Sequence, residues 1–239
     1  VEVLGKYRHP NIVVLLGHCI RDDNDGEGAP PCLVYEFMPG ASLKDRLHAR
    51  RRPLPGECVL TPVERIVVAS DVARGLAFLH TVADPPIIHQ DIKSDNILLS
   101  QAGNGALRAK IADFGTARFA PYLAQSSSRA QSHMSTAHVI GTRGYMPVEY
   151  AWKGHVSAKT DTFAFGVVLL ELLTARPALT DEQEMLAEEL EDDINAEPPR
   201  IERHLDARAG TWGRGRVTAF TRIAARCTAH QRERCMVAG

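Results

Sequence analysis

The distribution of apolar and polar residues predicts a few strands near the start of the chain and helices after them. The apolar, β-branched run at residues 12–16 indicates a strand, and a second strand is expected over residues 32–37. Residues 21–31, between these two runs, are acidic and rich in glycine and proline, which is typical of a loop. Strands first and helices afterwards favour an α+β fold over a doubly wound sheet.

The strongest helix signal begins at Thr61. Threonine as the N-cap, Pro62 at the first helical position and Glu64 as the third residue form the pattern of a capping box. Apolar residues then recur at helical spacing as far as about His80, so this helix is expected to contribute to the core.

Weaker patterns predict the remaining elements. A short helix is expected to open at residues 41–43, and residues 103–105 carry a Gly-Asn-Gly turn signal between two short strands. The apolar run at 161–173 indicates a buried helix. The acidic stretch at 181–195 is interpreted as an exposed helix.

Composition narrows the class of protein. Of the 239 residues, 44% are hydrophobic and 24% are charged, which is ordinary for a globular protein. The net charge of -1 provides no overall attraction to nucleic acid or to an acidic membrane, so we expect no nucleic-acid partner. No run approaches the roughly eighteen apolar residues of a membrane span. The cysteines form no C-x-x-C pair and are interpreted as reduced thiols in a reducing compartment: Cys19, Cys32, Cys58, Cys227 and Cys235.

Two motifs carry the candidate chemistry. Residues 89–96 read His-Gln-Asp-Ile-Lys-Ser-Asp-Asn, and residues 113–115 read Asp-Phe-Gly. In phosphoryl transfer an aspartate accepts the proton of the substrate hydroxyl, while an asparagine and a second aspartate hold magnesium. Carboxylate and amide oxygens suit that hard cation. Each motif alone could serve only to stabilise a loop, but their combination favours a phosphoryl-transfer site.

Several further stretches extend this pattern in a fixed order. The chain resembles the eukaryotic protein kinases of the serine/threonine type, with most similarity to plant receptor-like, Pelle and interleukin-receptor-associated kinases. The stretches that carry the resemblance are RHPNIVVLLGHC, LVYEFMPGASLKDRL, VARGLAFLH, IIHQDIKSDNILL, KIADFGTAR, GTRGYMPVEY and KTDTFAFGVVLLELLTARPA.

The resemblance implies a bilobal α+β fold whose small β lobe is incomplete in this chain. Residues 1–38 correspond to the end of a helix, two strands and the hinge of the small lobe. Residues 39–239 correspond to the large, mostly helical lobe, which is expected to be incomplete at its C-terminal end.

The resemblance also implies roles for the residues of the two motifs. Asp91 is expected to be the catalytic base or hydroxyl orienter, and Lys93 to neutralise the γ-phosphate of ATP. Asn96 and Asp113 are the expected Mg²⁺ ligands. Lys93 and Thr142 both match the serine/threonine subclass, and Thr142 is placed on the substrate platform. The implied cofactors are therefore ATP and Mg²⁺.

An adenine site is implied by matching positions. Tyr35 matches the gatekeeper residue, and Glu36, Phe37 and Met38 match the hinge whose backbone pairs with the base. Leu98 is expected to pack beneath the adenine ring. An edge strand with a core leucine would have the same appearance in the sequence.

Five further positions match structural roles. His89 and Phe114 match a stacked apolar spine, and Asp161 matches the residue that holds the backbone of the catalytic loop. Glu149 and Arg234 match a buried ion pair that ties the activation segment to the late helices.

The chain also departs from the family pattern. Gln90 stands where regulated kinases carry an arginine that binds a phosphorylated activation segment. Residues 146–149 read Met-Pro-Val-Glu, where Ala-Pro-Glu is usual. The chain contains no glycine-rich loop and no Val-Ala-x-Lys strand, so we expect these residues alone to bind ATP weakly.

Two functions are consistent with these features. The first is a serine/threonine kinase domain acting on protein substrates in the cytoplasm, with an upstream receptor or adaptor and with any membrane anchor outside this chain. The second is an inactive kinase-like scaffold that binds partners through its helical lobe.

Overall fold

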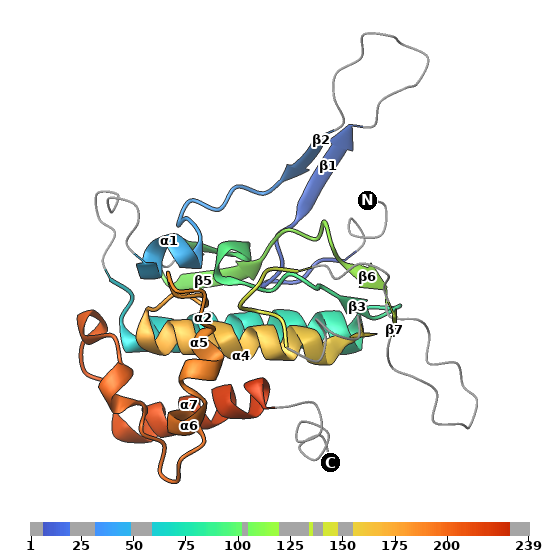
Figure 1. Ribbon diagram of the computed structural model, residues 1–239. Helices are drawn as coiled ribbons and strands as arrows, with labels where there is room; N and C mark the ends of the chain where they lie inside the picture. Colours follow the sequence, from blue (N-terminus) through green and yellow to red (C-terminus); the bar gives the residue numbers. More distant parts are fainter. Residues whose placement is uncertain are drawn as a thin grey trace.

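The fold is α+β, as the residue pattern predicts (Figure 1). The computed structural model describes residues 7–19, 32–48, 59–101, 105–119, 134–135, 141–147 and 155–229. Within these residues every sheet is a single antiparallel pair of strands. The pairs are β1 (Leu15–Cys19) with β2 (Cys32–Tyr35), β3 (Ile87–Ile88) with β6 (Arg118–Phe119), β4 (Ile97–Gln101) with β5 (Leu107–Ile111), and β7 (Met134–Ser135) with β8 (His155–Val156).

The helices form the bulk of the described structure. They are α1 (Leu43–His48), α2 (Pro62–Ala77), α4 (Ala158–Thr174), α5 (Leu186–Glu189), α6 (Glu191–Ile194) and α7 (Arg214–Thr228). A π-helical turn, Phe78–Val82, prolongs α2, and short 3-10 turns cover Ser94–Asn96, Ile201–His204 and Ala207–Ala209. None of the helices in the described residues is long and apolar enough to cross a membrane.

Helix α2 begins as its sequence predicts. The Thr61 hydroxyl accepts a hydrogen bond from the Glu64 amide, and the Glu64 side chain accepts one from the Thr61 amide. Two of the amides that a helix start leaves unpaired are therefore satisfied within four residues, which fixes where the helix begins.

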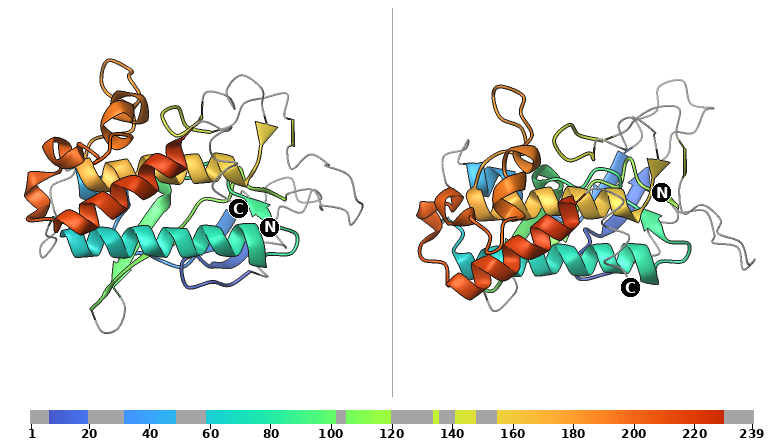
Figure 2. Two further views of the ribbon diagram at one scale, coloured as in Figure 1. Left: turned by 90° about the horizontal axis from the view of Figure 1, so that it is seen from below. Right: turned by 60° about the horizontal axis from the view of Figure 1, so that its bottom comes forward.

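Helix α4 is the centre of the core. Its side chains are buried almost throughout its length, because α2 and α7 both pack against it (Figure 2). Gly166 allows α7 to approach closely, since a Cβ atom at this position would lie 2.7 Å from side-chain atoms of Cys227 and Thr228. The apolar run predicted as a buried helix is therefore the main packing element.

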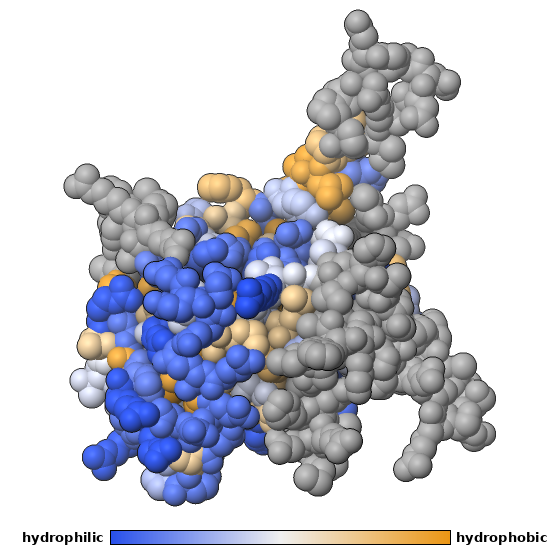
Figure 3. Space-filling view, viewed as in Figure 1, coloured by the Kyte–Doolittle hydropathy of each residue, from blue (hydrophilic) through white to orange (hydrophobic). Residues whose placement is uncertain are grey.

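The first strand starts later than its apolar run suggests. β1 covers Leu15–Cys19, whereas Ile12 makes only an isolated bridge to Ile111 at the end of β5. The β1–β2 hairpin stands away from the helices in Figure 1. Its apolar side chains form the orange patch at the base of the projecting part of the surface in Figure 3. Leu16 and Val34 on this hairpin are 62% and 50% exposed.

The prediction of one exposed acidic helix over residues 181–195 is wrong. Within this stretch only the short helices α5 (Leu186–Glu189) and α6 (Glu191–Ile194) are helical, and residues 181–185 are not. Leu186, Leu190 and Ile194 are buried at intervals of four residues, so one face of this segment belongs to the core. Helix α7 was not predicted.

Candidate active site

The catalytic loop is the stretch between β3 and β4, and a side chain of α4 binds its backbone. Asp161, in the first turn of α4, accepts hydrogen bonds from the amides of His89 at 2.8 Å and Gln90 at 2.9 Å. The ring of His80 lies 2.8 Å from the same carboxylate. Gln90 has a positive φ of 68°, so the buried carboxylate holds the loop in a conformation that non-glycine residues rarely adopt.

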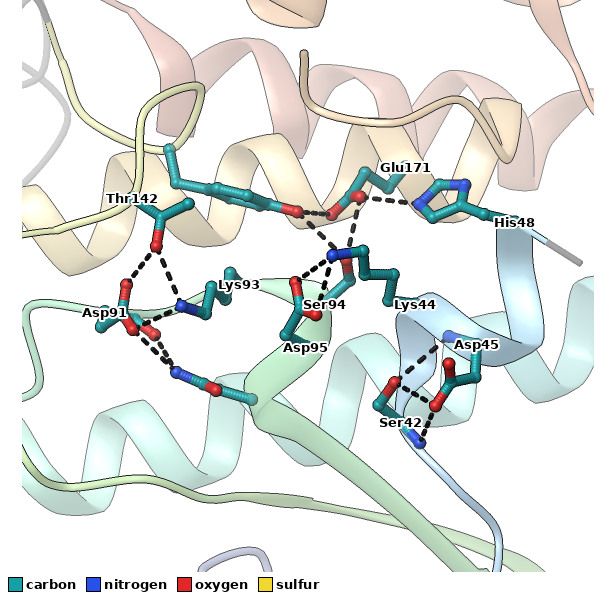
Figure 4. A network of polar contacts seen from close by, with 12 residues as sticks. Ser42, Lys44, Asp45, His48, Asp91, Lys93, Ser94, Asp95, Thr142 and Glu171 are labelled. Carbon is teal, nitrogen blue, oxygen red and sulfur yellow. Dashed lines mark hydrogen bonds and ion pairs between the residues drawn. The ribbon is translucent and has the colours of Figure 1, made fainter. Parts of the chain in front are cut away.

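Four side chains converge at the end of this loop (Figure 4). The Thr142 hydroxyl donates to Asp91 Oδ1 at 2.7 Å, and Lys93 Nζ lies 2.7 Å from Asp91 Oδ2 and 2.9 Å from the Thr142 oxygen. The Asn96 amide nitrogen donates to Asp91 Oδ2 at 3.0 Å. The structure thus brings together residues 51 positions apart in the chain.

The surroundings keep Asp91 ionised. Partial burial alone would raise the pKa of its carboxyl, but the hydrogen bonds from Lys93 and Thr142 outweigh that effect. The pKa of Asp91 therefore lies below its usual value. At neutral pH the side chain is a fixed anionic acceptor that can orient a hydroxyl group.

His89 is buried, and its tautomer follows from its contacts. Nε2 faces the Ala112 carbonyl oxygen at 3.0 Å and must donate, while Nδ1 accepts from the Asp91 amide at 3.3 Å. Burial lowers the pKa of His89, in agreement with a neutral ring. The ring also packs edge-to-face on Phe114, with 4.8 Å between centroids. The two expected spine residues are therefore in contact.

The β4–β5 hairpin places Asp113 beside Asn96. Ile97 pairs with Ile111 at the end of the ladder, and the Ala112 amide donates to the Asn96 carbonyl oxygen at 2.8 Å. Asp113 follows immediately with a positive φ of 61°, and its exposed carboxylate accepts from the Gly115 amide at 3.2 Å. Two residues with oxygen-bearing side chains therefore lie at the same end of one hairpin.

A small apolar cluster lies next to these oxygens. Met38, Ala112 and Val13 are buried together, and Tyr35 and Leu98 pack against them. Burial and the nearby Asp113 carboxylate raise the pKa of Tyr35. Three of the five residues expected at an adenine site thus share one cluster.

The other two expected adenine-site residues lie outside the cluster. The Glu36 amide donates to the Val14 carbonyl oxygen at 3.0 Å, and its carboxylate lies 2.6 Å from Lys110 Nζ. Phe37 is 87% exposed, so its ring takes no part in the cluster. Glu149 and Arg234 lie outside the described residues.

Comparison with known proteins decides the family. A family model described as "Protein kinase domain" matches residues 1–211. This chain belongs to the protein kinase family. The α+β structure is therefore a kinase fold, and the family generally uses ATP and Mg²⁺. The division of this kinase into residues 1–38 and 39–239 stays a prediction.

Plant kinases are among the curated relatives of this chain. The serine/threonine-protein kinase PBL35 of Arabidopsis thaliana is 42% identical over 179 residues, which are 75% of this chain and 32% of that protein. The serine/threonine-protein kinase PBS1 of the same plant is 41% identical over 182 residues, 76% of this chain and 36% of the relative. The leucine-rich repeat receptor protein kinase MSL1 of Oryza sativa subsp. japonica is 42% identical over 188 residues, which are 79% of this chain and 12% of that protein. This chain thus spans about a third or less of the relatives' length.

The oxygen donors fit a magnesium-bound nucleotide. Because the Asn96 amide nitrogen is bonded to Asp91, its amide oxygen remains for a cation. Asp113, whose carboxylate is exposed, follows Ala112, and the Ala112 amide is bonded to the Asn96 backbone. Magnesium usually binds one or two carboxylates and completes its octahedral shell with waters and substrate phosphates. In the described residues no group of three or more His, Cys, Asp or Glu could hold a metal by itself. The donor set therefore suits an ion that arrives with its nucleotide.

A buried polar network beside the catalytic loop was not predicted. The Glu171 carboxylate accepts from the Ser94 hydroxyl at 2.9 Å and the Tyr145 hydroxyl at 2.8 Å, and His48 Nε2 lies 3.0 Å away (Figure 4). Burial, followed by the Glu171 charge, raises the pKa of Tyr145. The network ties the catalytic loop and the segment after Thr142 to α4 and α1.

Proposed function

We propose that this kinase transfers the γ-phosphate of ATP to serine or threonine hydroxyls of protein substrates. The observation that carries the proposal is the four-residue cluster in which Asp91 is held by Lys93, Thr142 and Asn96. A loop that needed only to be stable would not require an ionised carboxylate with a lysine beside it. The relatives named as serine/threonine-protein kinases support the same chemistry.

Asp91 performs the proton step in this proposal. Its carboxylate orients the substrate hydroxyl and takes up its proton as the oxygen attacks phosphorus. Thr142 donates to Oδ1, and Lys93 and Asn96 both lie on Oδ2, so these three partners fix the carboxylate in one orientation. Lys93 lies against Oδ2 and supplies positive charge where negative charge develops. MgATP supplies the phosphoryl group when it is bound.

The remaining site residues are proposed to bind the cofactors. Asn96 and Asp113 hold Mg²⁺ through their side-chain oxygens. The backbone of residues 36–38 pairs with the adenine edge, with Tyr35 behind the base and Leu98 beneath it. The apolar cluster around Met38 supports this assignment, because an adenine ring needs a dry, flat surface.

Partners and location follow from the same proposal. Thr142, joined to both Asp91 and Lys93, belongs to the platform that receives the Ser or Thr of a protein substrate. Relatives named as receptor protein kinases support a cytoplasmic role downstream of a receptor or adaptor.

A phosphate-transfer assay tests the proposal. The chain is incubated with radiolabelled ATP, magnesium and a protein rich in serine and threonine, beside Asp91→Asn and Asp95→Asn variants. Asp95 lies in the same loop but pairs with Lys44 at the surface, so it is a matched control. Transfer onto Ser and Thr is expected to fall about 10²- to 10⁴-fold in Asp91→Asn alone. Equal transfer by the two variants contradicts the role of Asp91.

Calorimetry with MgATP separates transfer from binding. Asp113→Asn should weaken binding of the nucleotide with magnesium and have little effect on binding without it. A chain that binds MgATP in this way but transfers no phosphate would favour the scaffold function instead.

A further inference from the structure

Two cysteines lie directly opposite each other on the β1–β2 hairpin. Cys19 ends β1 and Cys32 begins β2, and the antiparallel register pairs them (Figure 1). Both residues are exposed. They are thirteen positions apart in the chain, so no short cysteine motif indicates this pairing.

The register matches the geometry of a disulfide. Directly opposed residues of an antiparallel pair have Cα atoms roughly 4.5 to 5.5 Å apart and side chains on the same face of the ribbon. A disulfide requires Cα atoms about 4.4 to 6.8 Å apart. The register therefore places the two Cα atoms within the range of a disulfide, and the fit is best if the residues form a non-hydrogen-bonded pair, where the Cβ atoms are closest.

We propose that Cys19 and Cys32 are a reversible thiol–disulfide site that reacts with low-molecular-weight disulfides. The thiolate of one cysteine attacks a sulfur of a disulfide such as oxidised glutathione, forms a mixed disulfide and releases one thiol. The thiolate of the second cysteine attacks the protein sulfur and displaces the other thiol. Two protein thiols are oxidised, and one disulfide is reduced to two thiols.

The location of the two cysteines separates them from Cys227 and connects them to the proposed adenine site. Cys227 is half-buried, and it lies on α7, across the molecule from the hairpin (Figure 1). Strand β2 runs from Cys32 to Tyr35 and then into the proposed hinge. A bond at Cys32 therefore fixes the strand that leads to the adenine site. Exposed disulfides of this kind are the readily reduced ones, which suits a reducing compartment.

Redox titration tests the proposal. The chain is equilibrated with mixtures of reduced and oxidised glutathione, trapped by alkylation, digested and analysed by mass spectrometry. A cross-linked peptide pair containing Cys19 and Cys32 is expected, and dithiothreitol should remove it. Cys19→Ser and Cys32→Ser should each give a glutathione adduct on the remaining cysteine, whereas Cys227→Ala should leave the cross-link unchanged. Circular dichroism verifies that the variants are folded.

A trivalent arsenical provides a second, non-oxidative measurement. Phenylarsine oxide bridges only thiols that are close together, so one equivalent should protect Cys19 and Cys32 from alkylation, and either serine variant should lose this protection. Separate glutathione adducts on both cysteines under oxidising conditions, or a preferred link to Cys58 or Cys235, would overturn the proposal. Lack of arsenical protection in the folded chain would do so as well.

Discussion

Asp161 holds the amide of His89 at 2.8 Å, although the two residues are 72 positions apart. The same carboxylate receives the Gln90 amide, so one buried anion fixes two consecutive peptide groups at the start of the catalytic loop. The catalytic loop must hold Asp91 in one orientation, because a proton acceptor works only when it is correctly positioned against the substrate hydroxyl. The two hydrogen bonds to Asp161 provide that rigidity.

Asp161→Asn is expected to lower the free energy of unfolding by about 2 to 4 kcal/mol. An amide side chain can accept through only one atom and would turn its NH₂ group toward a backbone amide. Urea denaturation measures the change, with Asp181→Asn at an exposed position as the control. A cost below that of the control would show that the carboxylate is not needed.

Thr142→Val should reduce phosphate transfer roughly 10- to 100-fold, whereas Thr142→Ser should retain most of it. Valine keeps the shape of threonine but removes the hydroxyl that donates to Asp91 Oδ1. Because that hydrogen bond helps to lower the pKa of Asp91, the acidic limb of the pH–rate profile should move to higher pH in the valine variant. Identical profiles for the two variants would contradict this explanation.

Gln90→Met should stabilise the protein by about 1 kcal/mol. Both polar atoms of the Gln90 side chain are buried and lack a hydrogen-bond partner in the described structure, which costs free energy that an apolar chain of similar shape avoids. Urea denaturation beside Gln101→Met, an exposed control, tests this. Destabilisation at Gln90 would mean that its amide is satisfied in solution.

Arg65→Met is expected to cost about 3 to 5 kcal/mol of stability. The guanidinium is buried and donates to Asp206 at 2.5 Å and to the carbonyl oxygens of Leu60 and Leu172. Its removal leaves a buried carboxylate with less compensation. The exposed pair of Arg222 with Glu197 is the control, and Arg222→Met should cost less than about 1 kcal/mol. Similar losses from both variants in thermal or urea unfolding would refute the distinction.

Stability should decrease as the pH falls below about 6.5, the ordinary histidine pKa. Burial lowers the pKa of His89 in the folded state, so below 6.5 the unfolded chain binds more protons and is favoured. The contribution of this residue is fully present above pH 6.5. His9 has a pKa lowered in the same direction, by burial and then by Arg74. Urea unfolding from pH 8 to pH 5 should therefore show a slope that His89→Asn and His9→Gln each reduce, and an unchanged slope in both would contradict the assignment.

Local signals were predictable, and interactions across the fold were not. The capping box of Thr61 and Glu64 is contained in four residues, so the sequence alone determines it. The start of β1 depends instead on which residues form backbone hydrogen bonds with β2. Ile12 forms its bridge with distant Ile111 and not within the hairpin. The positions of Asp91, Asn96 and Asp113 followed from motifs, although their roles stay predictions.

Helix α7 and the Glu171 network illustrate what the pattern does not contain. The α7 sequence is rich in arginine, alanine and threonine, so its apolar face is narrow. The role of this face is recognisable only when α7 is seen packed against α4. In the acidic stretch at 181–195, the many charged residues mask the four-residue spacing of the buried Leu186, Leu190 and Ile194. Ser94, Tyr145 and His48 are ordinary residues in separate segments, and nothing in the sequence joins them to Glu171.

The Glu171 carboxylate also has a consequence for how the chain reaches its native state. Its three partners come from the α1 helix, the catalytic loop and the segment after Thr142. A compact intermediate that lacks any one of them buries an incompletely satisfied anion, which is unfavourable. Packing of the central helix is therefore most favourable when all three segments are in place.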